Sequence, residues 1–212
     1  MIYFANPTKN PECWQHMETG RIGAIAVRQG DYYDHFPNAI WCADNGCYSE
    51  KDFNIDRWFT RLRTPRLRMD RCAFATAPDV YANATATLDR SAPWLPRIRD
   101  LGYPAALVAQ DGLTTDMLDW NSFDALFIGG TTIFKLGANT RALVAEARAR
   151  NKWVHLGRCN SHKRYRYAAA IGCHSADGTR IVYAPTSALA DILHWTSSHQ
   201  CQPALFDLIG HP

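Results

Sequence analysis

Eight short apolar runs recur along the chain, and segments with helical periodicity lie between many of them. The runs are Ile2–Phe4, Ile22–Val27, Ala39–Cys42, Cys72–Thr76, Ala105–Val108, Ala125–Ile128, Trp153–Leu156 and Ala170–Cys173. Uninterrupted apolar strands that alternate with helices are typical of a parallel sheet covered by helices. Eight such units predict a compact α/β fold, the (β/α)8 barrel of the TIM type, as a single domain over residues 1–212.

The expected helices must be short, because 212 residues lie near the lower limit for such a barrel. They are Asp52–Leu62, Ala84–Leu101, Thr140–Arg150, His162–Ile171 and Ser187–His199. An open, doubly wound sheet is the alternative architecture. No G-x-G-x-x-G motif follows the first apolar run, which argues against a dinucleotide-binding version of that alternative.

The composition favours a cytoplasmic protein without a membrane span. The chain has no run of 18 apolar residues, and its first residues lack the basic and apolar regions of a signal peptide. Its seven cysteines include no C-x-x-C pair, which favours reduced thiols over a disulfide scaffold or a zinc site. We therefore expect no metal ion, no organic cofactor and no membrane partner.

Basic residues gather in two clusters, although the net charge is only +3. The first comprises Arg57, Arg61, Arg63, Arg66, Arg68 and Arg71, and the second comprises Arg158, Lys163, Arg164 and Arg166. Clusters of this kind suit a polyanion that docks on one face, and a solvated helix face explains a charge run equally well. The expected nucleic-acid contacts are Arg61, Arg68, Arg158, Asn160, Lys163 and Arg164.

Polar residues and glycines follow six of the expected strands. In a barrel of this type the catalytic groups come from the carboxyl ends of the strands. The residues of interest there are Asp44, Asp79, Gln110, Gly129, Gly130, Arg158, His174 and Asp177. A carboxylate can stabilise or attack a sugar as an N-glycosidic bond breaks, and a glutamine amide can bind a purine edge. Turns favour Asp, Asn and Gly in any case, so the argument depends on the whole set.

The strand-end motifs resemble those of the tRNA-guanine transglycosylase superfamily. They are closest to its short branch in phages and bacteria, which is linked to 7-deazaguanine in DNA. The matching segments are CADNG (42–46), AQDG (109–112), FIGG (127–130), VHLGRCNS (154–161) with Arg164, and GCHSADGT (172–179). The resemblance covers about Ile40 to Thr179. It implies base exchange or excision in DNA, with a free 7-deazapurine base as a possible second substrate.

Within this resemblance, Asp44 is expected to act as an acid, a base or an electrostatic group. Asp79, Gln110, Gly129 and Gly130 would bind the base, and His174 with Asp177 would act on the sugar. His174 stands where the family motif has its first aspartate, which favours hydrolytic excision over exchange. The family's cysteine-rich zinc segment is absent, which favours DNA over tRNA.

Two other functions stay open at this point. A barrel that binds a modified base without chemistry is the first alternative, and His174 in the motif is its best support. A metabolic barrel that acts on a phosphorylated small molecule is the second, since Gly129 and Gly130 also suit a phosphate.

Overall fold

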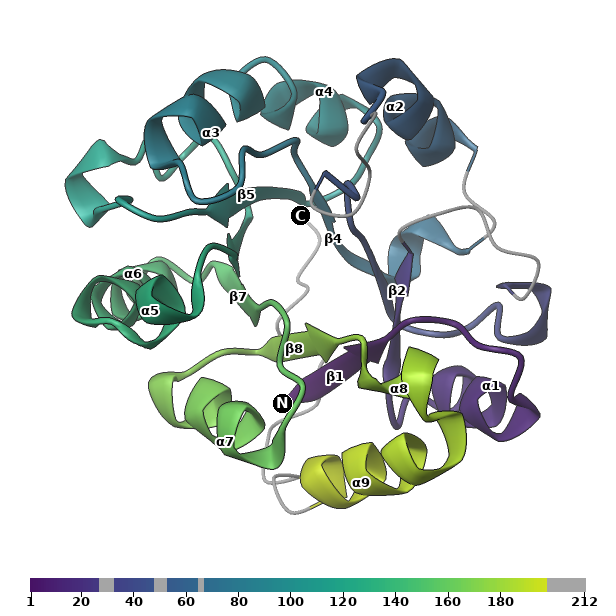
Figure 1. The fold of residues 1–212 in the computed structure, drawn as a ribbon. Coiled ribbons are helices and arrows are strands. Elements are labelled where there is room, and N and C mark those ends of the chain that lie inside the picture. Colours follow the sequence, from purple (N-terminus) through teal and green to yellow (C-terminus); the bar gives the residue numbers. More distant parts are fainter. Residues whose placement is uncertain (27–32, 48–52, 65–66, 198–212) are drawn as a thin grey trace.

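The chain folds into a closed barrel of eight parallel strands in the order β1 to β8 (Figure 1). This computed structural model describes residues 1–26, 33–47, 53–64 and 67–197. The strands are β1 (Ile2–Ala5), β2 (Gly23–Ala26), β3 (Trp41–Ala43), β4 (Cys72–Thr76), β5 (Ala105–Ala109), β6 (Ala125–Ile128), β7 (Trp153–Leu156) and β8 (Ser175–Gly178). Pairing of β8 with β1 closes the barrel, so the predicted TIM-type architecture is confirmed.

Helices surround the barrel on its outer side (Figure 1). They are α1 (Pro11–Glu18), α2 (Ile55–Arg63), α3 (Ala84–Ser91), α4 (Leu95–Asp100), α5 (Thr132–Leu136), α6 (Ala138–Ala149), α7 (His162–Ile171), α8 (Arg180–Tyr183) and α9 (Pro185–Ser197). Side-chain caps begin several of them: Asn54, Asn83 and Ser161 each accept a hydrogen bond from the backbone N–H three residues later. None of the helices in the described part of the chain is long and apolar enough to cross a bilayer.

The eighth strand lies a few residues later than the sequence predicts. The expected run Ala170–Cys173 is instead the end of α7, which stops at Gly172 in the left-handed conformation (φ 98°). β8 begins at Ser175, and its sequence SADG lacks the apolar signature of a buried strand. The prediction failed because the two inward-facing residues of β8 are polar. The second expected strand begins one residue late, at Gly23, and its last expected residue, Val27, lies outside the described residues.

Aromatic rings fill the interior of the barrel. Phe4, Phe74 and Phe127 lie in a chain of edge contacts with ring centroids 6.1 and 6.2 Å apart. The His155 ring contacts all three, at 4.5 Å from Phe127, 5.2 Å from Phe74 and 5.9 Å from Phe4. The interior is therefore a packed plug, and a cavity can exist only beyond it at an end of the barrel.

A second layer of core lies between the strands and the helices. Side chains alternate along each strand, so Leu107, Leu126 and Val154 point outward while their neighbours point into the barrel. They pack with Leu143, Val144 and other apolar residues of the surrounding helices. This double burial explains why the strands read as continuous apolar runs.

We expect Phe74→Ala to lower the free energy of unfolding by about 3–5 kcal/mol, because the ring is fully buried among other rings and would leave a cavity. Ile133→Ala is the matched control, because the Ile133 side chain is 87% exposed and its loss should change stability by less than about 0.5 kcal/mol. Urea denaturation followed by circular dichroism measures both. Equal effects would contradict the packed interior.

Candidate active site

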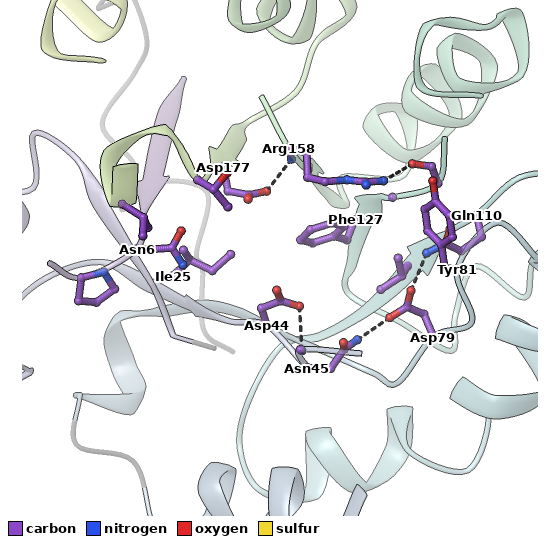
Figure 2. Close-up of a pocket in the computed structure, with 18 of the residues that line it drawn as sticks. Asn6, Ile25, Asp44, Asn45, Asp79, Tyr81, Gln110, Phe127, Arg158 and Asp177 are labelled. Atoms are coloured by element: carbon purple, nitrogen blue, oxygen red, sulfur yellow. Dashed lines mark hydrogen bonds between the residues drawn. The ribbon is translucent and has the colours of Figure 1, made fainter. Parts of the chain in front are cut away.

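A pocket of about 870 Å³ opens at the carboxyl ends of the strands (Figure 2). Ile25, Val108 and Phe127 form its apolar part. Its polar and glycine lining comprises Asn6, Asp44, Asn45, Gly46, Asp79, Gln110, Gly129, Gly130, Gly157, Arg158, Asp177 and Thr179. The volume is within the usual range for small-molecule sites. The strand-end residues predicted as a set therefore meet in one cavity, with His174 as the exception.

Asp44 directly follows β3, where its backbone N–H donates to the carbonyl of Ala26 on β2 (3.0 Å). Burial, together with the charges of Asp177 and Asp79, raises the pKa of its carboxyl to about 7. The backbone N–H of Gly46 lies 3.4 Å from Oδ1 and offsets only part of this effect. A carboxyl group with a pKa of about 7 can both donate and accept a proton near neutral pH.

Asp79 is held by two amide side chains (Figure 2). Asn45 Nδ2 donates to Oδ1 at 2.8 Å, and Gln110 Nε2 donates to Oδ2 at 2.5 Å. Burial raises the pKa of Asp79, and these two donors offset part of the rise because they favour the charged form. Asp79 is therefore fixed in orientation by neighbours that are themselves buried.

The amide of Gln110 has a defined orientation. Its Oε1 accepts a hydrogen bond from the backbone N–H of Ala82 at 2.9 Å, so the NH₂ group must face Asp79. One amide hydrogen is used by that carboxylate, and Gln110 lines the pocket with 3% of its surface exposed. Together Asp79 and Gln110 offer a planar ligand a carboxylate and an amide in fixed positions.

The turn after β6 brings backbone close to Gln110. A Cβ at Gly129 would lie 2.8 Å from Val108 Cγ1 and 2.9 Å from Gln110 Nε2. Gly130 has φ 74°, and a Cβ there would lie 2.5 Å from Asp111 Oδ2. Asp111 in turn accepts hydrogen bonds from the backbone N–H and the hydroxyl of Thr131. Only glycines allow the turn to pack this closely against Val108, Gln110 and Asp111.

Asp177 enters the pocket from β8 with one oxygen already engaged. Oδ1 accepts from His155 Nε2 at 2.9 Å and from the backbone N–H of Arg158 at 3.2 Å. Its residue surface is 8% exposed, and the exposed part lines the pocket. Asp44 and Asp177 lie on opposite sides of the cavity in Figure 2. Two carboxyl groups with different surroundings therefore face a common space.

Arg158 extends across the pocket from the end of β7. Its backbone has φ 58°, and its Nη2 donates to the carbonyl of Gly130 at 2.5 Å. The guanidinium carbon lies 5.3 Å from the ring centroid of Tyr81, which also lines the cavity. Beneath it, the buried Lys135 donates to the carbonyl of Gly157 at 3.0 Å. Burial and the neighbouring Arg158 charge lower the pKa of Lys135 to about 8.

The structure corrects the expected place of His174. This residue precedes β8, and its Nδ1 accepts from the backbone N–H of Val154, near the start of β7. It stacks on Trp153 with ring centroids 5.0 Å apart. His174 therefore lies at the amino-terminal end of the barrel, opposite the pocket, and cannot act on a ligand there. The error follows from placing the eighth strand too early.

The expected nucleic-acid contacts are divided between the two ends of the barrel. Arg68 precedes β4 at the end opposite the pocket and pairs with Asp70 at 2.6 Å, so the expectation that it joins the others is wrong. Arg61 lies on α2, and Arg66 lies outside the described residues. Asn160, Lys163 and Arg164 lie in the loop after β7 and the first turn of α7, adjacent to Arg158.

Several residues of the site were not singled out in the sequence. Asn45 and Asp111 directly follow predicted residues, and their adjacency was the available signal. His155 lies within one of the matching segments, and its contact with Asp177 depends on pairing between β7 and β8. Tyr81 and Tyr183 line the mouth and are 46% and 83% exposed. Nothing in their sequence neighbourhood distinguishes them.

Within the described ranges, no group of three or more His, Cys, Asp or Glu residues is arranged to hold a metal ion.

Comparison with known proteins extends only to the fold. No protein-family model matches the chain, and no curated protein matches it either. Among solved structures, the 3-hexulose-6-phosphate synthase from Salmonella typhimurium is similar, with a TM-score of 0.51 and 14% sequence identity. The match covers 94% of this chain and 100% of that one. At this identity the likeness shows that both chains share the barrel, and the site must be interpreted from its own residues.

We expect Asp44→Asn to stabilise the protein increasingly as the pH rises. The folded-state pKa of about 7 exceeds the unfolded value of 3.8, so the wild type loses stability between about pH 4 and pH 7, where only the unfolded state ionises. A neutral amide avoids this loss, so its advantage should grow by about 3 kcal/mol from pH 4.5 to pH 8. Urea unfolding at both pH values measures it.

Asp89→Asn provides the control for this measurement, because Asp89 is an exposed carboxyl on α3. Its effect on stability should differ little between the two pH values. If Asp44→Asn gave the same small difference, Asp44 would not be a desolvated carboxyl group.

Proposed function

We propose that this chain is an enzyme that cleaves the N-glycosidic bond of a nucleobase in DNA, with the base bound in the pocket at the carboxyl end of the barrel. The proposal rests mainly on one observation. Asp44 and Asp177 lie on opposite sides of a cavity whose lining also includes a carboxylate–amide pair and a glycine turn. Enzymes that cleave glycosidic bonds commonly use two carboxyl groups with different surroundings as their catalytic groups.

The base would lie between the apolar floor and the glycine turn. Asp79 and Gln110 support this position, because a carboxylate and an amide side by side offer acceptors and a donor to the edge of a purine. The approach to Gly129 and Gly130 permits hydrogen bonds from the base to the backbone. Phe127 and Val108 supply an apolar surface for a flat ring. A 7-deazapurine presents the same Watson–Crick edge, so the pocket suits it as well as a guanine.

The chemistry divides between the two other carboxyl groups. The ionised Asp177 attacks C1′ of the nucleotide, and the electrons of the breaking C1′–N bond go to the base. Asp44 in its protonated form gives its proton to the departing base, which leaves as a neutral molecule. The sugar is then esterified to Asp177, and Asp44 is ionised. The pKa of about 7 for Asp44 suits both halves of this cycle.

The second step releases Asp177 by the reverse chemistry. Asp44 takes a proton from the incoming nucleophile, which forms a new bond to C1′ as the ester bond breaks. A free base as nucleophile gives exchange, and water gives an abasic site. The hydrolytic outcome was favoured in the sequence because His174 occupied the motif position. Since the carboxylate of Asp177 faces the cavity, exchange is now equally consistent with the site.

The basic residues beside Arg158 support a polymeric substrate. Arg158, Lys163 and Arg164 lie together next to the pocket, where they can contact phosphates on both sides of the bound nucleotide. The base must leave a duplex, or come from a single strand, to enter the cavity.

A phosphorylated small molecule is the second candidate substrate. Arg158 favours it, because its guanidinium group lines the cavity itself and can bind a phosphate there. The structurally similar synthase from Salmonella typhimurium is named for such a compound, a hexulose phosphate. The two candidates differ in their products. Only the reaction on DNA releases a free base.

The experiment incubates the protein with guanine-containing or 7-deazaguanine-containing DNA, with and without free 7-deazaguanine. Mass spectrometry follows the released base and the DNA. We expect base release by the wild type and at least a ~1,000-fold loss of rate in Asp177→Asn and Asp44→Asn. Asp89→Asn, an exposed carboxyl exchange on α3, should retain full activity.

The nature of the product distinguishes the remaining possibilities. Release only with added base, on an intact strand, indicates exchange, whereas alkali-labile strands indicate hydrolysis. Trapping of a DNA–protein ester in the wild type and its absence in Asp177→Asn would support the covalent step. Tight DNA binding without any base release would indicate the binding module, and neither binding nor release would favour the phosphorylated small molecule.

A further inference from the structure

A chain of hydrogen bonds runs through the interior of the barrel and ends at Asp177. Trp153 Nε1 donates to Ser175 Oγ at 2.8 Å, and Ser175 Oγ lies 2.8 Å from His155 Nδ1. His155 Nε2 lies 2.9 Å from Asp177 Oδ1. His155 and Ser175 are fully buried. The four residues therefore form one continuous path from the start of β7 to the pocket.

Only one arrangement of hydrogens satisfies every member of this chain with a neutral imidazole. The indole nitrogen of Trp153 can only donate, so Ser175 Oγ accepts there. Ser175 then directs its own hydrogen to His155 Nδ1, which accepts it. The ring hydrogen must consequently sit on Nε2, where it donates to Asp177. The tautomer of His155 is thus set by Ser175 and Trp153.

Packing alone does not account for a histidine at this position. The ring lies among Phe4, Phe74 and Phe127, where a fourth phenyl ring would fill the same space without polar atoms. A buried imidazole loses its hydration, and Ser175 and Asp177 compensate for this only because they lie at matching positions on β8. A buried polar path of this kind is destabilising unless every member has its hydrogen-bond partner. Its presence therefore indicates a function beyond filling the barrel.

We propose that His155 is the positioning residue for Asp177, and that Ser175 and Trp153 hold it in the tautomer this requires. The inference rests on the proposed function, in which Asp177 attacks the sugar. Both donors to Asp177, His155 Nε2 and the backbone N–H of Arg158, engage Oδ1. Oδ2 accepts none of the hydrogen bonds found among the described residues, and the side chain lines the pocket. Oδ2 is therefore the atom directed at C1′.

Loss of His155 should act on the reaction and not on binding. Without the Nε2 donor, the carboxylate can rotate and its charged form loses a stabilising partner, so fewer molecules hold Oδ2 in line with C1′. The base would still contact Asp79, Gln110 and the glycine turn, while the side-chain hydrogen bonds found for His155 in the described part of the chain are with Ser175 and Asp177. The expected signature is a fall in kcat with little change in KM.

The experiment compares His155→Phe with His155→Gln in the full chain. The phenyl ring keeps the packing and removes the donor, and we expect kcat for base release to fall about 100-fold with KM changed less than about threefold. Glutamine places an amide N–H near the position of Nε2 and should recover at least about tenfold of that loss. Ser175→Ala frees the tautomer and should lower kcat by about tenfold.

A measurement that needs no activity tests the hydrogen-bond chain itself. Nitrogen-15 NMR of His155 should show a single tautomer with hydrogen on Nε2 in the wild type, and a mixture of tautomers in Ser175→Ala. A hydrogen on Nδ1 in the wild type would contradict the chain. An inactive wild type with the Nε2 tautomer would contradict the proposed function and leave the orientation of Asp177 intact.

The kinetic outcomes are equally distinct. If His155→Phe kept its kcat, or if Gln and Phe lost activity to the same extent in folded protein, the positioning role would be wrong. A rise in KM at unchanged kcat would also overturn it, because it would place His155 in base binding. Circular dichroism melting of each variant separates these outcomes from loss of folding.

Discussion

Three carboxyl groups, Asp44, Asp79 and Asp177, line one cavity, and their mutual repulsion is the constraint that the rest of the site must satisfy. Each has a different supply of hydrogen-bond donors. Asp79 receives two amide groups, and Asp177 receives an imidazole and a backbone N–H. Asp44 has backbone N–H contacts from Gly46 and Asn45 but no side-chain donor among the described residues, and its pKa is raised to about 7. The different roles that we propose for these residues follow from this uneven distribution of donors.

The packed interior of the barrel makes this distribution possible. Because side chains alternate along a strand, Trp153 and His155 face inward on β7, and Ser175 and Asp177 face inward on β8. The register places His155 beside Ser175, so the next inward position on β8 is Asp177. Inward-facing side chains two residues apart on β7 and on β8 thus form a path from the amino-terminal end of the barrel to the pocket. The same plug of rings that stabilises the fold excludes water from this path.

The barrel was predictable from the sequence because its outward-facing and inward-facing positions are both apolar on most strands. β8 lacks this pattern, because its inward positions carry Ser175 and Asp177. The alanine-rich end of α7 has an apolar run instead, and this run was predicted as the strand. The strand ends predicted Asp44, Asp79, Gln110 and both glycines of the turn correctly as pocket residues. His174 and Arg68 could not be placed, because a residue just before a strand and one just after it lie at opposite ends of the barrel.

Similarity of fold contributes little to the choice of function, because barrels of this type carry many unrelated reactions and the solved synthase shares only 14% of its residues with this chain. The proposed glycosidic chemistry rests instead on the surroundings of the two carboxyl groups. A two-step displacement at C1′ needs one carboxylate that is charged when it attacks and another that alternates between its two protonation states. In the proposed mechanism Asp177, held by two donors on one oxygen, has the first role, and Asp44, whose pKa is raised to about 7, has the second. Either residue in the other's surroundings would be unsuited to its step, so the pairing of residue with environment carries the assignment.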